Sequence, residues 1–370
     1  GCSPPLQKIR NNMNQKKKIY PQQGEKVVEA IDGYKHVMAL TLDSRTGNKE
    51  GVVRCIASRE GSVDTYGYVD RSELHRLHSD AAGRFIIGEK LIFSGESAIV
   101  NIIAGRLGDN ADWEYLGNED PDIWIDDETG LLHLYFTMPF RNAKEDKMSI
   151  SLGHAVGRDL DSLVMTEPVI LDITRSSAGD GLMGVAKELS IAPKNTSGSR
   201  FNLVESADKR NGIWYSVVRK VETRDMGQDW EMREVLFHPA EHGIAWAGEH
   251  ASPGPLVSPG FLDIGQGKSV GFLNGREASD RSGKEVKYGK FSVGLFVYDY
   301  EHGKIEWVSP EPFIFDSEAT TITFASQFVE KGNGKGILYA HVDDSFIRSY
   351  YVNAEAIKGF LPKEYTEASF

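Results

Sequence analysis

The chain has 370 residues, of which 40% are apolar and 26% are charged, and its formal net charge is −12. This negative charge argues against a nucleic-acid partner, which would require a basic surface. No apolar run approaches the roughly 20 residues that a membrane helix needs, so we expect no transmembrane segment. The 38 glycines and the 10% aromatic content favour many short strands joined by tight turns.

The first 26 residues are predicted to form a flexible tail, in which Cys2 precedes a polar stretch over residues 7–25. Two interpretations stay open for this tail. Cys2 is either a lipid-anchored cysteine left after signal removal, in a cell-envelope or secreted bacterial protein, or part of an ordinary disordered tail of a trimmed, cytoplasmic chain. Cys2 and Cys55 cannot build a disulfide framework, and no metal-ligand spacing involves them.

Short apolar strands recur along the rest of the chain, and long amphipathic helical patterns are scarce. Strands are expected at residues 37–42, 52–57, 85–93, 123–125, 131–137, 149–155, 201–204, 213–218, 269–273, 293–298, 324–329, 337–341 and 347–352. Turn signals separate them, at residues 45–48, 128–130, 210–212, 301–303 and 331–334. This pattern indicates antiparallel hairpins, and therefore a sandwich, a barrel or a propeller.

A looser repeat favours one of these three architectures. Four segments share an acidic or small first residue, a strand, a glycine turn and an aromatic strand, and they begin at Glu119, Glu188, Gly248 and Thr320. Their starts lie about 60 to 70 residues apart, which leaves room for about five four-stranded blades. We therefore predict an all-β chain in which residues 27–370 form a single five-bladed β-propeller.

Four segments, in this order, resemble glycoside hydrolase family 130, a family of five-bladed propellers that contains mannoside phosphorylases and mannosidases. The matching segments are 114–121 with its Glu-Asp-Pro sequence, the lysine-led strand at 186–194, the Gly-Pro loop and following strand at 251–256 and 269–275, and the closing stretch at 322–347. The resemblance covers residues 90–355 approximately. It implies cleavage of a mannoside or related oligosaccharide by an inverting mechanism, without a cofactor or metal.

Two positions depart from the pattern of that family. Asp122 stands where the family has an arginine after the proline, and Val204-Glu205 stands where its phosphorylases have a His-Arg pair that helps to bind phosphate. A phosphate dianion binds poorly beside a carboxylate. We therefore expect hydrolysis rather than phosphorolysis. Two alternatives stay open, namely phosphorolysis with the same acid, and a non-catalytic propeller that only binds carbohydrate.

Asp120 and Glu205 are the predicted catalytic pair. Inverting hydrolysis needs an acid for the leaving oxygen and a base for water, with carboxyl groups ~6.5–9.5 Å apart. The resemblance implies that Asp120 is the acid, acting through a sugar hydroxyl, and Pro121 favours an extended Asp120 that faces a cavity from the mouth of a strand. A turn-forming aspartate is the alternative. Glu205 is the first choice of base, before Glu188 and Glu249.

A further set of side chains is predicted to bind the oligosaccharide substrate. This set comprises Glu119, Lys187, Glu188, Glu249, His250, Asp344 and Arg59. Each has a plainer alternative as a solvated lysine, a turn aspartate, a hydrogen-bonded carboxylate or histidine, or a surface arginine. Four tryptophans are candidates for stacking on sugar rings, and at least two of them are expected to pack inside blades instead, out of Trp113, Trp124, Trp214 and Trp246. The sequence does not set the sugar, the linkage or the oligomeric state.

Overall fold

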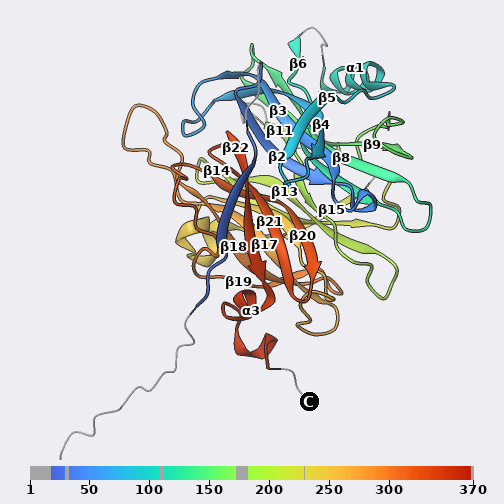
Figure 1. Cartoon of the computed structure of the whole chain (residues 1–370). Coiled ribbons are helices and arrows are strands. Elements are labelled where there is room, and N and C mark those ends of the chain that lie inside the picture. The colour runs from blue at the N-terminus through green and yellow to red at the C-terminus, as the bar shows by residue number, and fades with distance from the viewer. Residues whose placement is uncertain (1–17, 30–32, 109–111, 172–181, 229, 368–370) are drawn as a thin grey trace, which may run out of the picture.

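The computed structural model describes residues 18–29, 33–108, 112–171, 182–228 and 230–367. These residues are mostly β-strands, as Figure 1 shows, so the predicted all-β class is confirmed. Most of the predicted tail, with Cys2, lies outside the described residues. Strand β1 already begins at Gln22, before the predicted tail boundary at residue 26.

The described strands form four sheets, of four, six, eight and four strands. We divide them into five antiparallel meanders of four strands, because the eight-stranded sheet holds two such meanders and the six-stranded sheet holds one meander with two added strands. The first comprises β2 (His36–Leu42), β3 (Glu50–Glu60), β4 (Val69–Ser79) and β5 (Phe85–Lys90), and the second comprises β7 (Glu119–Ile125), β8 (Leu132–Asn142), β9 (Lys147–Gly157) and β10 (Val164–Met165). The third comprises β12 (Lys187–Ser190), β13 (Arg200–Arg210), β14 (Ile213–Thr223) and β15 (Glu231–Phe237), and the fourth comprises β16 (His250–Leu256), β17 (Lys268–Arg276), β18 (Phe291–Asp299) and β19 (Lys304–Val308). The fifth comprises β20 (Thr323–Gly332), β21 (Lys335–Val342), β22 (Phe346–Asn353) and β1 (Gln22–Val28).

Few elements lie outside these meanders. Two short strands extend the second meander, because β6 (Glu114–Tyr115) pairs with β8 and β11 (Leu182–Val185) pairs in parallel with β9. The helices and helical turns are α1 (Glu96–Leu107), α2 (Pro239–His242), α3 (Ala354–Lys358), η1 (Ser44–Thr46), η3 (Ala245–Ala247) and η4 (Lys363–Tyr365). No helix in the described ranges is long and apolar enough to cross a bilayer.

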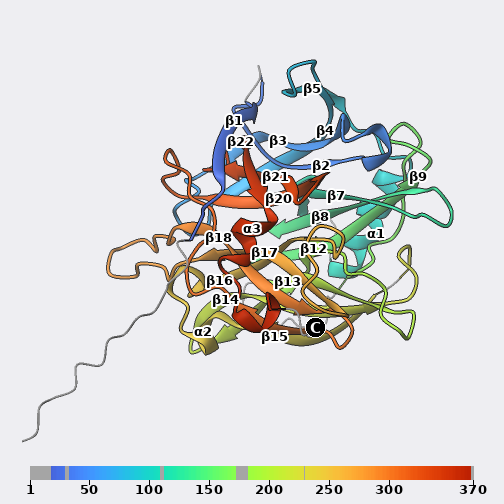
Figure 2. The same cartoon turned by 60° about the horizontal axis from the view of Figure 1, so that its bottom comes forward.

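The first strand of each meander lies on the inside of the molecule. These five inner strands touch in a closed cycle, in which β2 contacts β7, β7 contacts β12, β12 contacts β16, β16 contacts β20, and β20 contacts β2. In Figure 2 the sheets are arranged around the region where the inner strands meet. The third and fourth meanders are joined by a single parallel bridge, between Ser216 and His250. The cycle therefore surrounds a central axis.

Residues from both ends of the described chain complete the fifth meander. Strand β1 pairs antiparallel with β22, where Gln22 lies opposite Tyr351. Arg348 donates a hydrogen bond from Nη1 to the carbonyl oxygen of Gly24 at 3.1 Å. The fifth meander is thus completed by pairing between the earliest and the latest described strands.

The hydrophobic core lies between neighbouring meanders. Buried aromatic rings such as Phe272 and Phe313 pack between the fourth and fifth meanders. Trp113 and Trp246 are buried in other parts of the core, and Nε1 of Trp246 donates to the carbonyl oxygen of Ser309 at 2.9 Å. The expectation that at least two of the four tryptophans pack inside the fold is therefore confirmed.

Candidate active site

Each inner strand carries an irregularity in its pairing. The register shifts between Met38 and Leu40, between Glu119 and Asp122, between Lys187 and Ser190, between Pro253 and Leu256, and between Ala325 and Gln327. Such bulges redirect side chains and are common beside functional sites. The five bulges therefore reshape the inner strands all around the axis.

At three of these bulges the backbone is strained. Ala39, Asp120 and Glu188 have φ angles of +52°, +47° and +53°, in the left-handed region that L residues rarely adopt. The prediction that Pro121 keeps Asp120 extended is therefore wrong. The bulge overrides the preference of the residue before proline, because the two residues between the paired positions must turn the chain locally. Such strain is retained where the surrounding structure holds it, often at functional sites.

A cavity of about 450 Å³ lies at one end of the axis. Seven of the nine predicted site residues line it: Asp120, Lys187, Glu188, Glu205, Glu249, His250 and Asp344. A second cavity of about 420 Å³ is lined by the residues that follow along the same inner strands, and Asp120 and Glu188 line both cavities. Asp122 lines the second cavity, where burial raises the pKa of its carboxyl to about 7. The two shared carboxyls thus separate the cavities.

Asp120 faces the first cavity, as predicted, and two cations hold its carboxylate. Arg54 donates from Nη1 to Oδ1 at 2.9 Å, and the Lys187 ammonium lies 3.8 Å from Oδ2. Burial alone would raise the pKa of Asp120, but the charges of Arg54 and Lys187 lower it to about 2. Asp120 is therefore ionised at neutral pH in the free protein.

The surroundings of Glu188 act on its pKa in the opposite direction. Burial, together with the negative charges of Asp120 and Glu205, raises the pKa of Glu188 well above its ordinary value, against the attraction of Lys187. The site thus favours the ionised form of Asp120 and the protonated form of Glu188.

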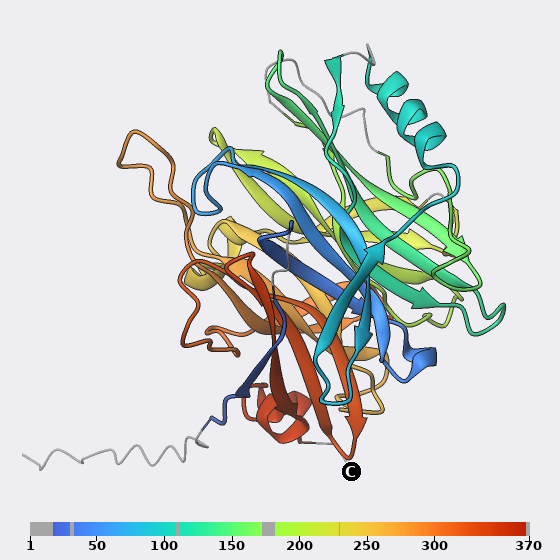
Figure 3. The ribbon, with the colours of Figure 1, turned by 45° about the horizontal axis from the view of Figure 1, so that its top comes forward.

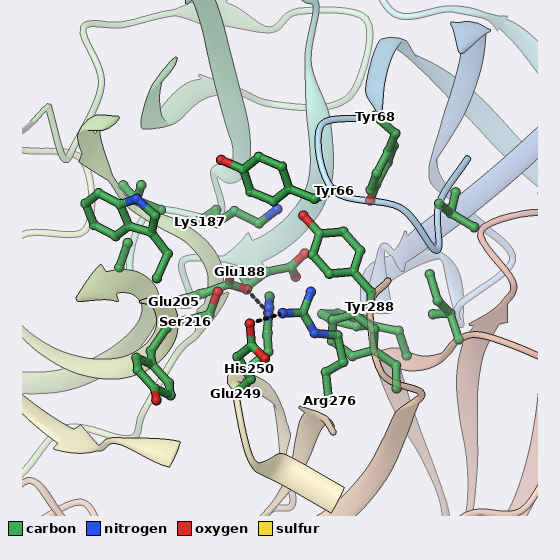
Figure 4. A pocket seen from close by; sticks show the side chains of 18 of the residues that line it. Tyr66, Tyr68, Lys187, Glu188, Glu205, Ser216, Glu249, His250, Arg276 and Tyr288 are labelled. Carbon is green, nitrogen blue, oxygen red and sulfur yellow. Dashed lines mark ion pairs between the residues drawn. The ribbon is translucent and has the colours of Figure 1, made fainter. Parts of the chain in front are cut away.

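Glu205 lies on β13, directly opposite Lys187 of β12. Its Oε2 atom lies 3.2 Å from Nε2 of His250 (Figure 4). Burial alone would raise the pKa of Glu205, but the contacts with His250 and Lys187 lower it to about 2. Burial also lowers the pKa of His250, so the imidazole is neutral at pH 7. Glu205 therefore presents a carboxylate to the cavity.

Glu249 and Asp344 also line the cavity, but their carboxylates have protein partners. Glu249 accepts from both Nη atoms of Arg281 and from the backbone N–H of Ser279, and these contacts lower its pKa against the effect of burial. Asp344 lies 3.2 Å from Nε2 of His341, and this contact lowers its pKa against the effect of burial. Glu249 is thus less available as a base than Glu205.

Two predicted substrate-binding residues lie outside the cavity wall. Glu119 accepts from Nη2 of Arg54 at 2.8 Å and from Ser72 at 3.2 Å, behind Asp120. Burial and Asp120 raise the pKa of Glu119 to about 7, against the attraction of Arg54. Arg59 forms two hydrogen bonds with Asp70, at 2.6 and 2.9 Å. In the structure Glu119 holds Arg54 in place, whereas Arg59 pairs with Asp70 within the first meander; neither Glu119 nor Arg59 lines the cavity.

Sequence reasoning missed an aromatic and basic part of the cavity wall. Tyr66, Tyr68, Arg276 and Tyr288 line the cavity beside the predicted residues. The tyrosines lie in long connections, where no strand pattern marked them. Trp214 is the one candidate tryptophan that lines this cavity, and Trp124 lines the second one.

One motif match does not make a nucleophile. Residues 267–271 read Gly-Lys-Ser-Val-Gly, which fits Gly-x-Ser-x-Gly, the sequence of a nucleophile elbow. In the structure Ser269 is buried within β17, whereas an elbow places its serine in an exposed turn between a strand and a helix. Serine-centred hydrolysis therefore has no support at this position.

Comparison with solved structures finds several proteins of similar fold. A β-1,2-mannobiose phosphorylase from Listeria innocua, in complex with β-1,2-mannobiose, has a TM-score of 0.58 at 11% identity and covers 92% of this chain and 98% of its own. A second structure has a TM-score of 0.58 at 16% identity and covers 91% of this chain and 95% of its own. It comes from work on the GH130 family of mannoside phosphorylases, which contains glycoside hydrolases that target β-1,2 mannosidic linkages in Candida mannan. A glycosyl hydrolase from Bacteroides ovatus has a TM-score of 0.57 at 18% identity and covers 93% and 92%.

No family model matches the chain, and no curated protein matches its sequence. At 11% to 18% identity, the structural likeness shows the fold alone. The resemblance of the four segments to glycoside hydrolase family 130 is confirmed at this level.

Proposed function

We propose that the chain is a divergent member of glycoside hydrolase family 130, a five-bladed β-propeller that hydrolyses a mannoside or related oligosaccharide with inversion. The five meanders are its blades, and the cavity at the end of the axis is its active site. The observation that carries this proposal is the buried cluster of three carboxyls, Asp120, Glu188 and Glu205, around the single ammonium of Lys187.

The protonation states of the three carboxyls fit acid and base roles. In the free protein Glu188 holds the proton, which it passes to Asp120 as Asp120 protonates the leaving oxygen through a sugar hydroxyl. Exchange with solvent restores this proton to Glu188 after the products leave. Carboxyls whose environments push their pKa values apart commonly divide these tasks. Glu205 is ionised and accepts a proton from the attacking water. The water oxygen bonds to the anomeric carbon as the glycosidic bond breaks, so two sugars with free hydroxyls result.

The charges around the cavity favour water over phosphate as the nucleophile. Arg54 is occupied by Glu119 and Asp120, and Arg281 is occupied by Glu249. The remaining ammonium, on Lys187, has four carboxyls as its nearest charges. A phosphate dianion would have to approach this negative cluster while Arg54 and Arg281 are paired with carboxylates and Arg276, which also lines the cavity, lies 3.5 Å from Glu249.

A glycan panel, assayed with and without inorganic phosphate, tests this function. The panel should include β-1,2-mannobiose, which is bound in one of the similar structures. The expected products are free sugars at a rate that does not depend on phosphate, and NMR of the first product should show inversion. Formation of a sugar 1-phosphate would establish phosphorolysis instead. If no glycan is turned over, the alternative function is favoured, namely a non-catalytic propeller that binds carbohydrate.

Two isosteric variants test the assigned roles. Asp120→Asn and Glu205→Gln should each lower turnover by about 10²–10⁴-fold, because they remove proton transfer but keep shape. Asp120→Asn should affect natural glycosides more than aryl glycosides, which have better leaving groups. Azide should partly restore Glu205→Gln and leave Asp120→Asn inactive. The exposed Glu234→Gln is the matched control, and wild-type turnover in both site variants would contradict the assignment.

A further inference from the structure

Two loops from non-adjacent meanders meet over the cavity. Loop 61–68 joins β3 to β4 in the first meander, and loop 277–290 joins β17 to β18 in the fourth. The backbone N–H of Tyr66 donates to the carbonyl oxygen of Val286 at 3.1 Å, and that of Tyr288 donates to Asp64 at 2.9 Å. We call these two loops the loop bridge. Because their inner strands β2 and β16 are not neighbours in the cycle, the loop bridge spans the cavity mouth.

The loop bridge is fastened to the cavity wall by charged groups. Arg281, within loop 277–290, pairs with Glu249, which directly precedes inner strand β16. The Arg276 guanidinium lies 4.0 Å from the ring centroid of Tyr288, in cation–π contact. Glu249 is therefore a positioning residue, which holds loop 277–290 against the site rather than acting on the substrate.

The loop bridge presents three tyrosines to the cavity. Tyr66, Tyr68 and Tyr288 all line it, and in Figure 4 their rings lie together on one side of the carboxyls. Tyr66 and Tyr68 meet Tyr288 edge-on, at centroid distances of 6.3 and 6.5 Å. Tyr66 remains 64% exposed although it belongs to this cluster. An exposed aromatic ring beside a wall of carboxyls matches a pyranose, which has apolar C–H faces and a polar rim of hydroxyls.

We propose that the loop bridge is a second sugar-binding subsite, in which Tyr66 stacks on the pyranose next to the one held by the carboxyls. Tyr288 supports the ring of Tyr66, Tyr68 packs against Tyr288 in turn, and Glu249 with Arg281 fixes the loop that carries Tyr288. This inference rests on the proposed function, because it assumes that the first sugar lies among Asp120, Glu188 and Glu205. It assigns the recognition of the neighbouring sugar unit to the first and fourth meanders.

Calorimetric titration with mannose and with β-1,2-mannobiose tests the subsite, in an Asp120→Asn background that prevents turnover. The disaccharide should bind more tightly than the monosaccharide. Tyr66→Ala should weaken disaccharide binding by about 5- to 20-fold, as expected for lost apolar contact of one ring face. Mannose binding should change by less than about twofold. Tyr66→Phe should retain the affinity, and Tyr351→Ala, which removes a tyrosine that is 48% exposed on β22, is the matched control.

The outcomes separate this inference from the proposed function. If Tyr66→Ala weakens both sugars equally, or neither, the subsite is overturned even when the wild-type protein hydrolyses glycans. If the wild type turns over no glycan but Tyr66→Ala selectively weakens the disaccharide, the subsite is supported and the catalytic proposal fails. If neither sugar binds to the Asp120→Asn protein, the subsite is overturned as well.

Discussion

Replacing Arg54 with methionine should destabilise the protein far more than the loss of a surface ion pair. The Arg54 side chain is 8% exposed and lies 2.8 Å from Glu119, 2.9 Å from Asp120 and 3.5 Å from Asp70. Methionine keeps an unbranched apolar stem but leaves three buried carboxyls without their shared cation. The cost arises because Glu119 and Asp120 lose their nearest cation while they stay buried, whereas Asp70 keeps Arg59 and Asp120 keeps the more distant Lys187.

The size of the effect follows from this geometry. Removing one member of a buried ion pair costs about 3–5 kcal/mol. At about 2.1 cal/mol/K per residue, the unfolding entropy of a chain of this length is about 0.8 kcal/mol/K, so Tm should fall by about 4–6 °C. The matched control is Arg84→Met, because Arg84 is 69% exposed and lies 3.3 Å from Asp80. An exposed pair contributes at most about 1 kcal/mol, so Tm should change by about 1 °C or less.

The loss of stability in Arg54→Met should shrink in acid. The charges of Arg54 and Lys187 overcome burial and lower the pKa of Asp120 from 3.8 to about 2. A lowered pKa gives stability that is present above the unfolded-state value and is lost as pH falls through the folded-state value. The Tm difference between wild type and Arg54→Met should therefore narrow as pH falls from about 4 toward 2.

Thermal melts from pH 7 to pH 2, followed by circular dichroism, check both parts of this prediction. Adding Glu119→Gln to Arg54→Met should recover part of the lost stability, because it removes one of the unpaired carboxylates. The reasoning is refuted if Arg54→Met melts together with Arg84→Met at pH 7, or if the difference from wild type widens in acid.

Three further variants test separate parts of the structure. The stability of Glu188→Gln should rise relative to wild type as pH increases from about 5 to 8. The reason is that the raised pKa of Glu188 makes the folded wild type hold a proton that the unfolded state has released. Parallel curves of Tm against pH for variant and wild type would contradict this. Glu249→Gln should speed limited proteolysis within loop 277–290, because the anchor of Arg281 is weakened, whereas equal cleavage in wild type and variant would show that the anchor is dispensable. Gly117→Ala should destabilise by about 3 kcal/mol or more, because its φ is +95° and a Cβ would lie 1.9 Å from the carbonyl oxygen of Ser72. In the control Gly130→Ala, φ is +70° and no atom lies within 4 Å of the added Cβ. This control should lose only about 1 kcal/mol of unfolding free energy, measured in urea. Equal losses of stability in the two glycine variants would contradict the steric argument.

The strands that the sequence predicts are those with a simple apolar pattern. All thirteen expected apolar segments coincide with strands of the structure, as residues 131–137 do with β8. Several strands were missed, and two of them have a clear reason: β4 buries polar groups such as Asp70 and His75, and β16 contains Pro253 and Pro255. Proline and buried charge contradict the composition expected of a strand. Local rules thus fail where a strand carries buried charge or proline, and of these two strands only β16 lines the cavity.

The composition of the site was partly predictable, but its geometry was not. Motif order indicated Asp120, Lys187 and Glu188, which the inner strands bring to one cavity. Arg59 was misplaced because its partner Asp70 lies opposite it on the next strand, and such pairing depends on register. The contact between Tyr66 and Tyr288 joins loops more than two hundred residues apart in the chain, as the hydrogen bond between Thr65 and Lys287 does with a separation of 222. No local pattern encodes such a contact.

The pairing of β1 with β22 has a consequence for biosynthesis. The hydrogen bond between Arg348 and Gly24 spans 324 positions of the chain. At about 5–20 residues per second, the ribosome delivers β22 roughly 15–65 s after β1. During that time β1 has no native partner, and an unpaired strand edge is a template for association with other chains. The pairing of β1 with β22 has a high contact order and cannot form before β22 is synthesised, so folding yield should depend on how well residues 22–28 are shielded until then.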